Sequence, residues 1–299
     1  MFSIAGCATP QYAVRETPAP DESAWARQIE LTISAAQASD LEQHGVRRIQ
    51  AGESLFGFNI QQMVDGLSRV TERPSLSYRA FLIPDKDPNA AALADGRVYL
   101  TTGMLQYLAS RGSRDSELAF ILGHELAHTV AQHLVKRYQQ LQHEQMMLSV
   151  VELGAAVATR NQGSQGQQLG GVVKDIAGLV TDVINSGYSQ DQELEADQLG
   201  ARYLIRAGYN PWTVLPFMQD FERFDVGGIF LRTHPDMATR AHYLERYLME
   251  SGAPSATPRA AARTDREETR ARLREAQKLY PVGSQSWKNL QQQLDALNQ

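Results

Sequence analysis

Two histidines stand four positions apart in a stretch that has the apolar periodicity of a long helix. They are His124 and His128, and Glu125 directly follows the first of them. Four positions on a helix correspond to a rotation of about 40°, so both rings project from one face and can reach a single cation. The apolar spacing over residues 117–140 predicts that this helix has a buried face. The fold must therefore hold a pair of metal-ligating side chains on a helix inside its core.

A second, acidic segment offers the ligand that this pair lacks. A catalytic zinc ion takes three protein ligands and leaves one position open. Glu193 and Asp197 lie one turn apart at the start of another predicted helix, over residues 191–207. We interpret Glu193 as the third metal ligand, and Asp197 as the acceptor for the ring N–H of a ligand histidine, whose orientation it would fix. Glu195 lies between them and is expected to point away.

Three other histidines do not fit this pattern. His133 lies five positions after His128, about 140° further around an uninterrupted helix, so it is not expected to share the site. His143 and His242 are interpreted as surface or packing residues. Tyr188, just before the acidic segment, can either orient a substrate or pack in the core, and the sequence leaves both interpretations open.

Composition excludes several classes of protein. The chain has 299 residues, of which 42% are hydrophobic, enough for a sizeable core. Its 29 Lys and Arg against 34 Asp and Glu give a formal charge of −5, which argues against binding to a nucleic-acid backbone. The best apolar run, residues 148–158, is too short for a membrane-spanning helix. Because Cys7 is the single cysteine, a metal must bind to His, Asp or Glu.

Changes in composition along the chain indicate four regions. They are a proline-rich tether (residues 1–20), a helical lead-in (21–75), the domain that carries the metal-ligating residues (76–250), and a linker with a helical C-terminal appendage (251–299). In the third region, two alternating segments ahead of the histidine pair predict strands. The expected fold class is therefore α+β, mainly helical, with a small sheet beside the helix of His124 and His128.

The expected elements follow from periodicity and from Pro and Gly positions. Helices are expected at residues 22–50, 53–72, 117–140, 191–207, 211–224, 264–280 and 286–297, and strands at 76–83 and 97–102. Two further apolar helices, at 148–158 and 172–184, are joined by a glycine-rich loop. They either pack on the core or form a mobile lid or membrane-facing element. The C-terminal helices are either a solvated appendage or a surface that docks a partner.

The two motifs together resemble a known protein family. His124 to His128 with the downstream Glu193 and Asp197 is similar to the gluzincin arrangement, in the form found in family forty-eight of the zinc metallopeptidases. That family includes the CAAX prenyl proteases, the heat-shock protease HtpX, the mitochondrial Oma-type protease and periplasmic proteases that police outer-membrane assembly. The resemblance implies a zincin-like fold and bound zinc. The chain lacks the membrane helices of the prenyl proteases and HtpX, and this difference favours the soluble periplasmic branch of the family.

A late segment extends the resemblance. His234 and Pro235, followed by Arg240, are similar to the late His-Pro loop of the same family. The resemblance implies that His234 approaches the zinc and occupies or guards its open position, while Arg240 helps to anchor or stabilise it. Either side chain is then also a candidate to stabilise the oxyanion of the reaction. On the sequence alone, His234 is a single histidine before a proline, which is also typical of a surface loop.

These residues and the resemblance predict a zinc-dependent endopeptidase with Glu125 as its general base. If residues 97–102 form a free sheet edge, an extended substrate can bind there by strand addition. We therefore expect cleavage of unfolded or extended segments of envelope proteins, as quality control, with latency through His234. The alternative is a chaperone-like or binding protein whose zinc site is structural or kept closed by His234.

The N-terminal residues carry a second resemblance. Small residues precede Cys7, as in the lipobox at which bacterial lipoprotein precursors are cut and lipidated. This predicts an exported protein in the periplasm, anchored to the outer membrane by a lipid on Cys7. A complete signal also needs a basic start and an apolar stretch of about 7 to 15 residues, so an unstructured terminus with an incidental cysteine stays open.

Overall fold

The structure is a computed structural model that describes residues 11–42, 45–111, 115–143, 187–224, 237–254, 270–271, 273–275 and 277–296. Cys7 and His234 lie outside these residues. So do the two apolar helices expected at 148–158 and 172–184, and most of the linker expected to begin at 251.

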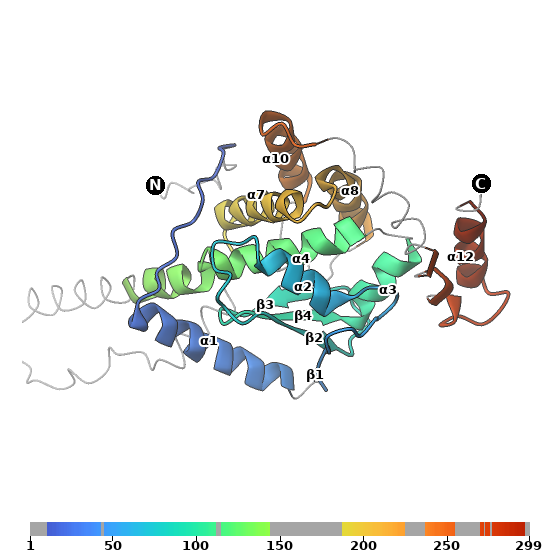
Figure 1. Cartoon of the computed structure of the whole chain (residues 1–299), viewed down its shortest axis with the longest axis horizontal. Helices are drawn as coiled ribbons and strands as arrows, with labels where there is room; N and C mark the ends of the chain where they lie inside the picture. Colours follow the sequence, from blue (N-terminus) through green and yellow to red (C-terminus); the bar gives the residue numbers. More distant parts are fainter. Residues whose placement is uncertain are drawn as a thin grey trace, which may run out of the picture.

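A small sheet lies next to the helix that carries the histidine pair (Figure 1). The described strands are β1 (Arg47–Arg48), β2 (Arg79–Ile83), β3 (Ala90–Ala92) and β4 (Arg97–Thr101), in the order β1-β2-β4-β3. β4 pairs in parallel with β2 and antiparallel with β3, so it lies inside the sheet. The condition set above, a free edge at residues 97–102, is therefore not met. The edge strands of the described sheet are β1 and β3. β3 contacts the histidine helix, and its three alanines have little strand propensity of their own.

The histidine helix, α4, lies between this sheet and a layer of helices (Figure 1). The described helices are α1 (Ala24–Glu42), α2 (Ile60–Ser68), α3 (Thr102–Ser110), α4 (Asp115–Val130), α7 (Gln190–Arg206), α8 (Val214–Phe224), α10 (Met237–Glu250) and α12 (Gln285–Ala296), with a 3-10 turn, η1, at Pro211–Thr213. In Figure 1, α7, α8 and α10 lie on the side of α4 opposite the sheet. None of the described helices is both long and apolar enough to cross a membrane. The mainly helical α+β class is confirmed.

Both helices of the lead-in are shorter than predicted. The first ends at Glu42 rather than near residue 50, because Gly45 adopts a φ of 72° and the chain turns into β1. The second begins at Ile60 rather than at residue 53, and Gly57, with a φ of 84°, lies in the turn that precedes it. Hydrophobic periodicity extends through both turns, so it overestimated the helices.

The helix expected at residues 117–140 is interrupted. α4 ends at Val130, residues 131–132 form a turn, and the helix resumes over residues 133–143. Gln132 has a φ of 54°, in the left-handed region where a right-handed helix cannot continue. Its amide side chain accepts from the backbone N–H of Asp21 at 2.6 Å and donates to the Asp21 carbonyl and to Glu30, both at 2.8 Å. These bonds stabilise a turn that redirects the chain.

The described part of the expected tether has no helix or strand but makes specific contacts. The Tyr12 hydroxyl donates to Glu250 of α10 at 2.6 Å. Arg15 donates through its backbone N–H to Gln198 at 2.7 Å and through its guanidinium to Asp191 at 2.6 Å, both on α7. These contacts join residues 11–22 to the helical layer above α4.

The described part of the C-terminal helices packs on the core. Leu273, Leu290 and Leu294 are buried in the main hydrophobic cluster. The Gln293 side chain donates to the carbonyl of Ser110, at the end of α3, at 3.1 Å. These three leucines thus pack inward, while most of the other described residues of this region are exposed or partly buried.

Candidate metal and active site

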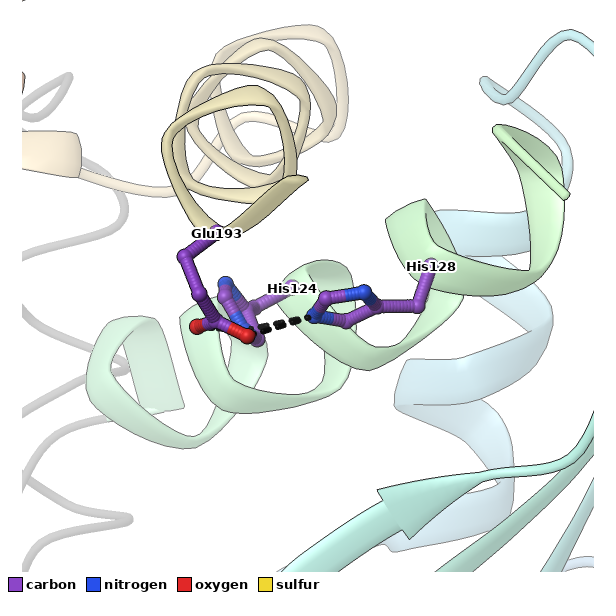
Figure 2. A group of neighbouring side chains, drawn as sticks. All are labelled: His124, His128 and Glu193. Carbon is purple, nitrogen blue, oxygen red and sulfur yellow. Dashed lines mark hydrogen bonds and ion pairs between the residues drawn. The ribbon is translucent and has the colours of Figure 1, made fainter. Parts of the chain in front are cut away.

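Three donor side chains converge between α4 and α7 (Figure 2). His124 and His128 project from one face of α4, and Glu193 reaches them from the first turn of α7. The two Nε2 atoms are 3.0 Å apart, and the carboxylate oxygens of Glu193 lie 3.5 and 3.6 Å from them. All three side chains are buried, and their ligand atoms lie within 4.8 Å of one another. The structure thus brings together the three residues expected to bind metal.

The start of α7 is set by a local sequence signal. The Ser189 hydroxyl accepts from the backbone N–H of Gln192, and the Gln192 side chain accepts from the backbone N–H of Ser189 at 2.9 Å. This capping box satisfies two N–H groups that a helix start leaves without partners. Acidic side chains in the first turn, including Glu193, are also favoured by the helix dipole. Together these features place Glu193 one turn into the helix.

A buried ion-pair network lies behind the three donors. Asp197 places Oδ1 2.9 Å from Nδ1 of His124, the ring nitrogen on the side away from Glu193. The Arg240 guanidinium donates to both oxygens of Asp197, at 2.8 and 2.7 Å, and Nη1 lies 2.8 Å from Oε2 of Glu193. Arg240 is 3% exposed. All of its side-chain nitrogens face these carboxylates, and this arrangement favours a role in holding them.

The charges around His124 favour a bound cation. Burial by itself lowers the pKa of His124, but the bonds to Asp197 and Glu193 outweigh it and raise the pKa to about 9. Burial likewise raises the pKa of Asp197, but the positive charge of Arg240 and the bond to His124 outweigh it, so this pKa lies below its usual value. The surroundings therefore stabilise positive charge beside the His124 ring. Two imidazoles and a carboxylate in such surroundings fit a divalent metal ion.

His133 reaches the site, and the expectation that it lies apart is wrong. Its Nδ1 is 2.8 Å from Nδ1 of His128, and its Nε2 is 3.2 Å from Oε2 of Glu195. The prediction assumed an unbroken helix, whereas the turn at Gln132 redirects the chain so that His133 faces back towards α4. Glu195 does point away from the three donors, but it bonds the histidine behind them. Burial lowers the pKa of His133 and Glu195 only partly offsets this effect.

Comparison with known proteins adds the family. Residues 58–248 match Peptidase family M48. The chain belongs to this family. Its relatives include the "Beta-barrel assembly-enhancing protease" of Yersinia pestis, which is 28% identical over 142 residues, or 48% of this chain and 28% of the relative. "Metalloprotease LoiP" of Escherichia coli (strain K12) is 23% identical over 229 residues, 74% of this chain and 84% of the relative.

A mitochondrial protein is also among the relatives of this M48 chain. "Metalloendopeptidase OMA1, mitochondrial" of Bos taurus is 26% identical over 179 residues, 57% of this chain and 32% of the relative. The match thus spans about a third or less of the Yersinia and bovine proteins. The family and the names of these relatives support a metalloprotease, and the resemblance to family forty-eight is confirmed.

Tyr188 covers one face of a candidate ligand in the M48 chain. Its ring stacks on that of His128, with centroids 3.6 Å apart and an interplanar angle of 18°. Burial, together with the negative charges of Glu125 and Glu193, raises the pKa of Tyr188 well above its usual value, so it remains a neutral phenol. Stacking shows how Tyr188 packs and leaves its role toward substrate as a prediction.

A narrow hollow adjoins this pair. It lies between the end of β3 and the turn at residues 131–132, and its lining residues are Ala92, Ala94, His128, Thr129, Gln132, Leu134 and Tyr188.

Glu125, next to the first histidine on α4, is 1% exposed. His143 and His242 are exposed, as expected for residues outside the site.

Proposed function

We propose that this M48 peptidase is a zinc-dependent endopeptidase that cleaves unfolded or extended segments of envelope proteins. The observation that carries the proposal is the convergence of His124, His128 and Glu193, with Glu125 in the same motif. Two histidines and one carboxylate, with a position left for water, form a common ligand set of catalytic zinc. The negative surroundings that raise the pKa of His124 support a cation at this point.

The proposed reaction assigns a task to each side chain. Bound zinc would supply Lewis acidity, polarising a peptide carbonyl and making water more acidic. Glu125 takes the proton from the attacking water and passes it to the leaving amine. Arg240 holds Glu193 and Asp197 in place, through the contacts described above. His234, outside the described residues, is proposed to stabilise the oxyanion and to guard the open position in the resting enzyme.

The sheet edge supports a preference for extended substrates. β3 is the last strand in the order β1-β2-β4-β3 and contacts α4. A peptide added beside β3 would bind through its backbone and run past the hollow lined by Ala92 and His128. Recognition of backbone rather than sequence suits unfolded segments. A role in envelope quality control is consistent with the name of the Yersinia relative.

The proposed location is the periplasm, with a lipid on Cys7 as the anchor to the outer membrane. The lipobox-like residues before Cys7 support it. Intact-mass analysis of the precursor expressed in bacteria tests this point, because lipidation adds a diacylglyceryl group and acyl chain to the cysteine. An unmodified Cys7 would contradict the anchor and leave the peptidase proposal standing.

The decisive experiment compares zinc content and casein cleavage in wild type and two variants. Glu125→Gln removes the base, and Glu117→Gln is a matched control on the same helix. We expect about one zinc per chain in all three proteins, because neither glutamate is a ligand. Casein cleavage is expected in wild type and Glu117→Gln only. Zinc without cleavage in any of them would instead point to a latent site or to the chaperone-like or binding protein, which His234→Ala then separates. Cleavage by Glu125→Gln would contradict the assigned base.

A further inference from the structure

We infer that Glu195 and His133 form a relay that sets which ring nitrogen of His128 is offered to the metal. The inference rests on the proposed function and adds two positioning residues to its site. The relay runs from Oε2 of Glu195 to Nε2 of His133 over 3.2 Å, and from Nδ1 of His133 to Nδ1 of His128 over 2.8 Å. Nε2 of His128 then faces His124 and Glu193.

Hydrogen-bond chemistry orders the protons along this chain of contacts. An ionised carboxylate can only accept, so Nε2 of His133 must carry a proton to bond Glu195. A neutral imidazole has one N–H, so Nδ1 of His133 is an acceptor. The contact at 2.8 Å then requires Nδ1 of His128 to donate. The lone pair of the His128 ring is therefore on Nε2, the nitrogen that faces the other two ligands.

The opposite order of protons is unfavourable at two places. It would set the lone pair of His133 against the carboxylate of Glu195, and it would put an N–H of His128 where a metal must bind. His133 is 0% exposed, so water cannot take over the bonds that it makes. The negative charge of Glu195 thus acts on His128 through His133.

The tautomer of the other ligand histidine, His124, is set in the same way, but by direct contact with a carboxylate. Oδ1 of Asp197 lies 2.9 Å from Nδ1 of His124, which leaves Nε2 of His124 to face the metal position. Asp197 and Glu195 are both on α7, as is the ligand Glu193. A single helix therefore supplies one ligand and the two carboxylates that orient the other two ligands.

Two features of the fold hold the relay in place. The turn at Gln132 delivers His133 to His128, and it is stabilised by the bonds of Gln132 to Asp21 and Glu30. The Tyr188 ring, stacked at 3.6 Å, fixes the plane of the His128 ring. The ring nitrogens bond within this plane, and Nδ1 of His133 lies 2.8 Å from Nδ1 of His128.

The test measures zinc affinity of the full chain by competition with a chelator of known affinity. His133→Leu removes the acceptor for His128, and we expect the zinc Kd to rise about 10- to 100-fold, the usual effect of losing such a partner. His133→Asn keeps an acceptor oxygen near the place of Nδ1, so we expect a Kd within about threefold of wild type. If zinc affinity is lost with leucine and kept with asparagine, the loss comes from the missing hydrogen-bond acceptor and not from altered packing.

A double-mutant comparison tests the part played by Glu195. Glu195→Gln alone should weaken zinc binding, and it should add nothing in the His133→Leu background, because the carboxylate acts through His133. The matched control is Asp191→Asn, which removes the same charge from the same helix start. Its carboxylate pairs with Arg15 at 2.6 Å, so zinc affinity should not change. An equal effect of Glu195→Gln in both backgrounds would overturn the relay.

Nitrogen-15 NMR of histidine-labelled, zinc-free protein gives a second readout that does not depend on activity. The relay predicts that wild-type His128 carries its proton on Nδ1, and that His133→Leu shows a mixture of both tautomers. A proton on Nε2 in wild type would contradict the relay. Failure of wild type to bind zinc at all would instead contradict the proposed function. Normal zinc binding by His133→Leu would overturn the relay alone.

Discussion

Gly123 and Gly200 face each other where α4 and α7 pack together. A methyl group on Gly200 would lie 3.0 Å from the backbone nitrogen of His124, and one on Gly123 would lie 3.3 Å from the carbonyl oxygen of Gly200. The two backbones therefore approach more closely than most Cβ contacts do. Because α4 and α7 lie so close together, the carboxylate of Glu193 comes within 3.5 and 3.6 Å of the Nε2 atoms of His124 and His128.

Gly200→Ala is expected to force the two helices apart. The added methyl group meets backbone atoms, which cannot move aside as a flexible side chain can, so we expect a loss of about 1–3 kcal/mol in the free energy of unfolding. Zinc affinity should fall as Glu193 moves away. The control is Gly66→Ala on α2, where no atom lies within 4 Å of the added methyl group. Urea unfolding of both zinc-free variants checks the prediction, and equal stabilities would contradict it.

Arg240→Lys keeps the charge but loses the planar fork that holds Asp197 and Glu193. If Arg240 acts by holding these carboxylates, zinc affinity should fall about tenfold or more together with kcat/KM. If it acts on the oxyanion instead, kcat should fall while zinc affinity stays unchanged. The contacts at 2.7 and 2.8 Å favour the first result, and chelator competition alongside peptide cleavage distinguishes the two.

Arg73 and Glu30 form a buried ion pair beneath the turn at Gln132. Arg73 donates to Glu30 at 2.6 Å, and both side chains are almost completely buried. Arg73→Met leaves the buried Glu30 carboxylate with only the partly exposed Arg27, at 3.0 Å, as its cation, so the free energy of unfolding should fall by about 3 kcal/mol. Arg47→Met is the control, since its pair with Glu53 is exposed and should contribute less than about 1 kcal/mol. Similar losses in the two variants, measured by urea unfolding, would contradict this prediction.

Stability of the metal-free protein should depend on the protonation of His124. Its folded-state pKa is raised to about 9, against about 6.5 in an unfolded chain. The stabilisation is therefore fully present below about pH 6.5 and is lost as the pH rises through about 9. After treatment with a chelator, the excess melting temperature of wild type over His124→Gln should shrink across this range. A pH-independent difference would show that the histidine does not titrate as expected.

His234→Ala tests latency in the resting enzyme. Removal of a side chain that guards the open position should raise casein cleavage, because substrate no longer competes with the imidazole. Initial rates at equal zinc content measure the effect. Unchanged cleavage would contradict latency, and lower cleavage would contradict it while supporting a role in oxyanion stabilisation.

The candidate ligands could be predicted from the sequence because their positions depend only on helix geometry. His124 and His128 share a face of any helix, and Glu193 and Asp197 share a face of the next motif helix. His133 could not be placed in this way. The position of His133 depends on the φ of Gln132. The Gln132 side chain is held by Asp21 and by Glu30 of α1, both more than a hundred positions earlier in the chain.

The sheet shows the same division between local and distant causes. Alternating sequence patterns predicted β2 and β4, which lie within the expected ranges, although four consecutive residues of β4 are buried. β3 consists of three alanines, and only its pairing with β4 makes it a strand. Which strands lie at the edges of the sheet could not be predicted, since strand order is decided by pairing rather than by any local pattern.

The acidic residues at the start of α7 each meet a different part of the chain. The pairs are Arg15–Asp191, Arg240–Glu193, His133–Glu195 and His124–Asp197. Three regions far apart in the sequence, at Arg15, at residues 124–133 and at Arg240, must dock on one helix before the metal ligands stand together. Contacts of such long range carry a loop-closure cost that must be met before they stabilise the fold. Proteolytic competence is therefore acquired only by a chain that has finished folding, which protects a nascent peptidase from cleaving itself or its neighbours.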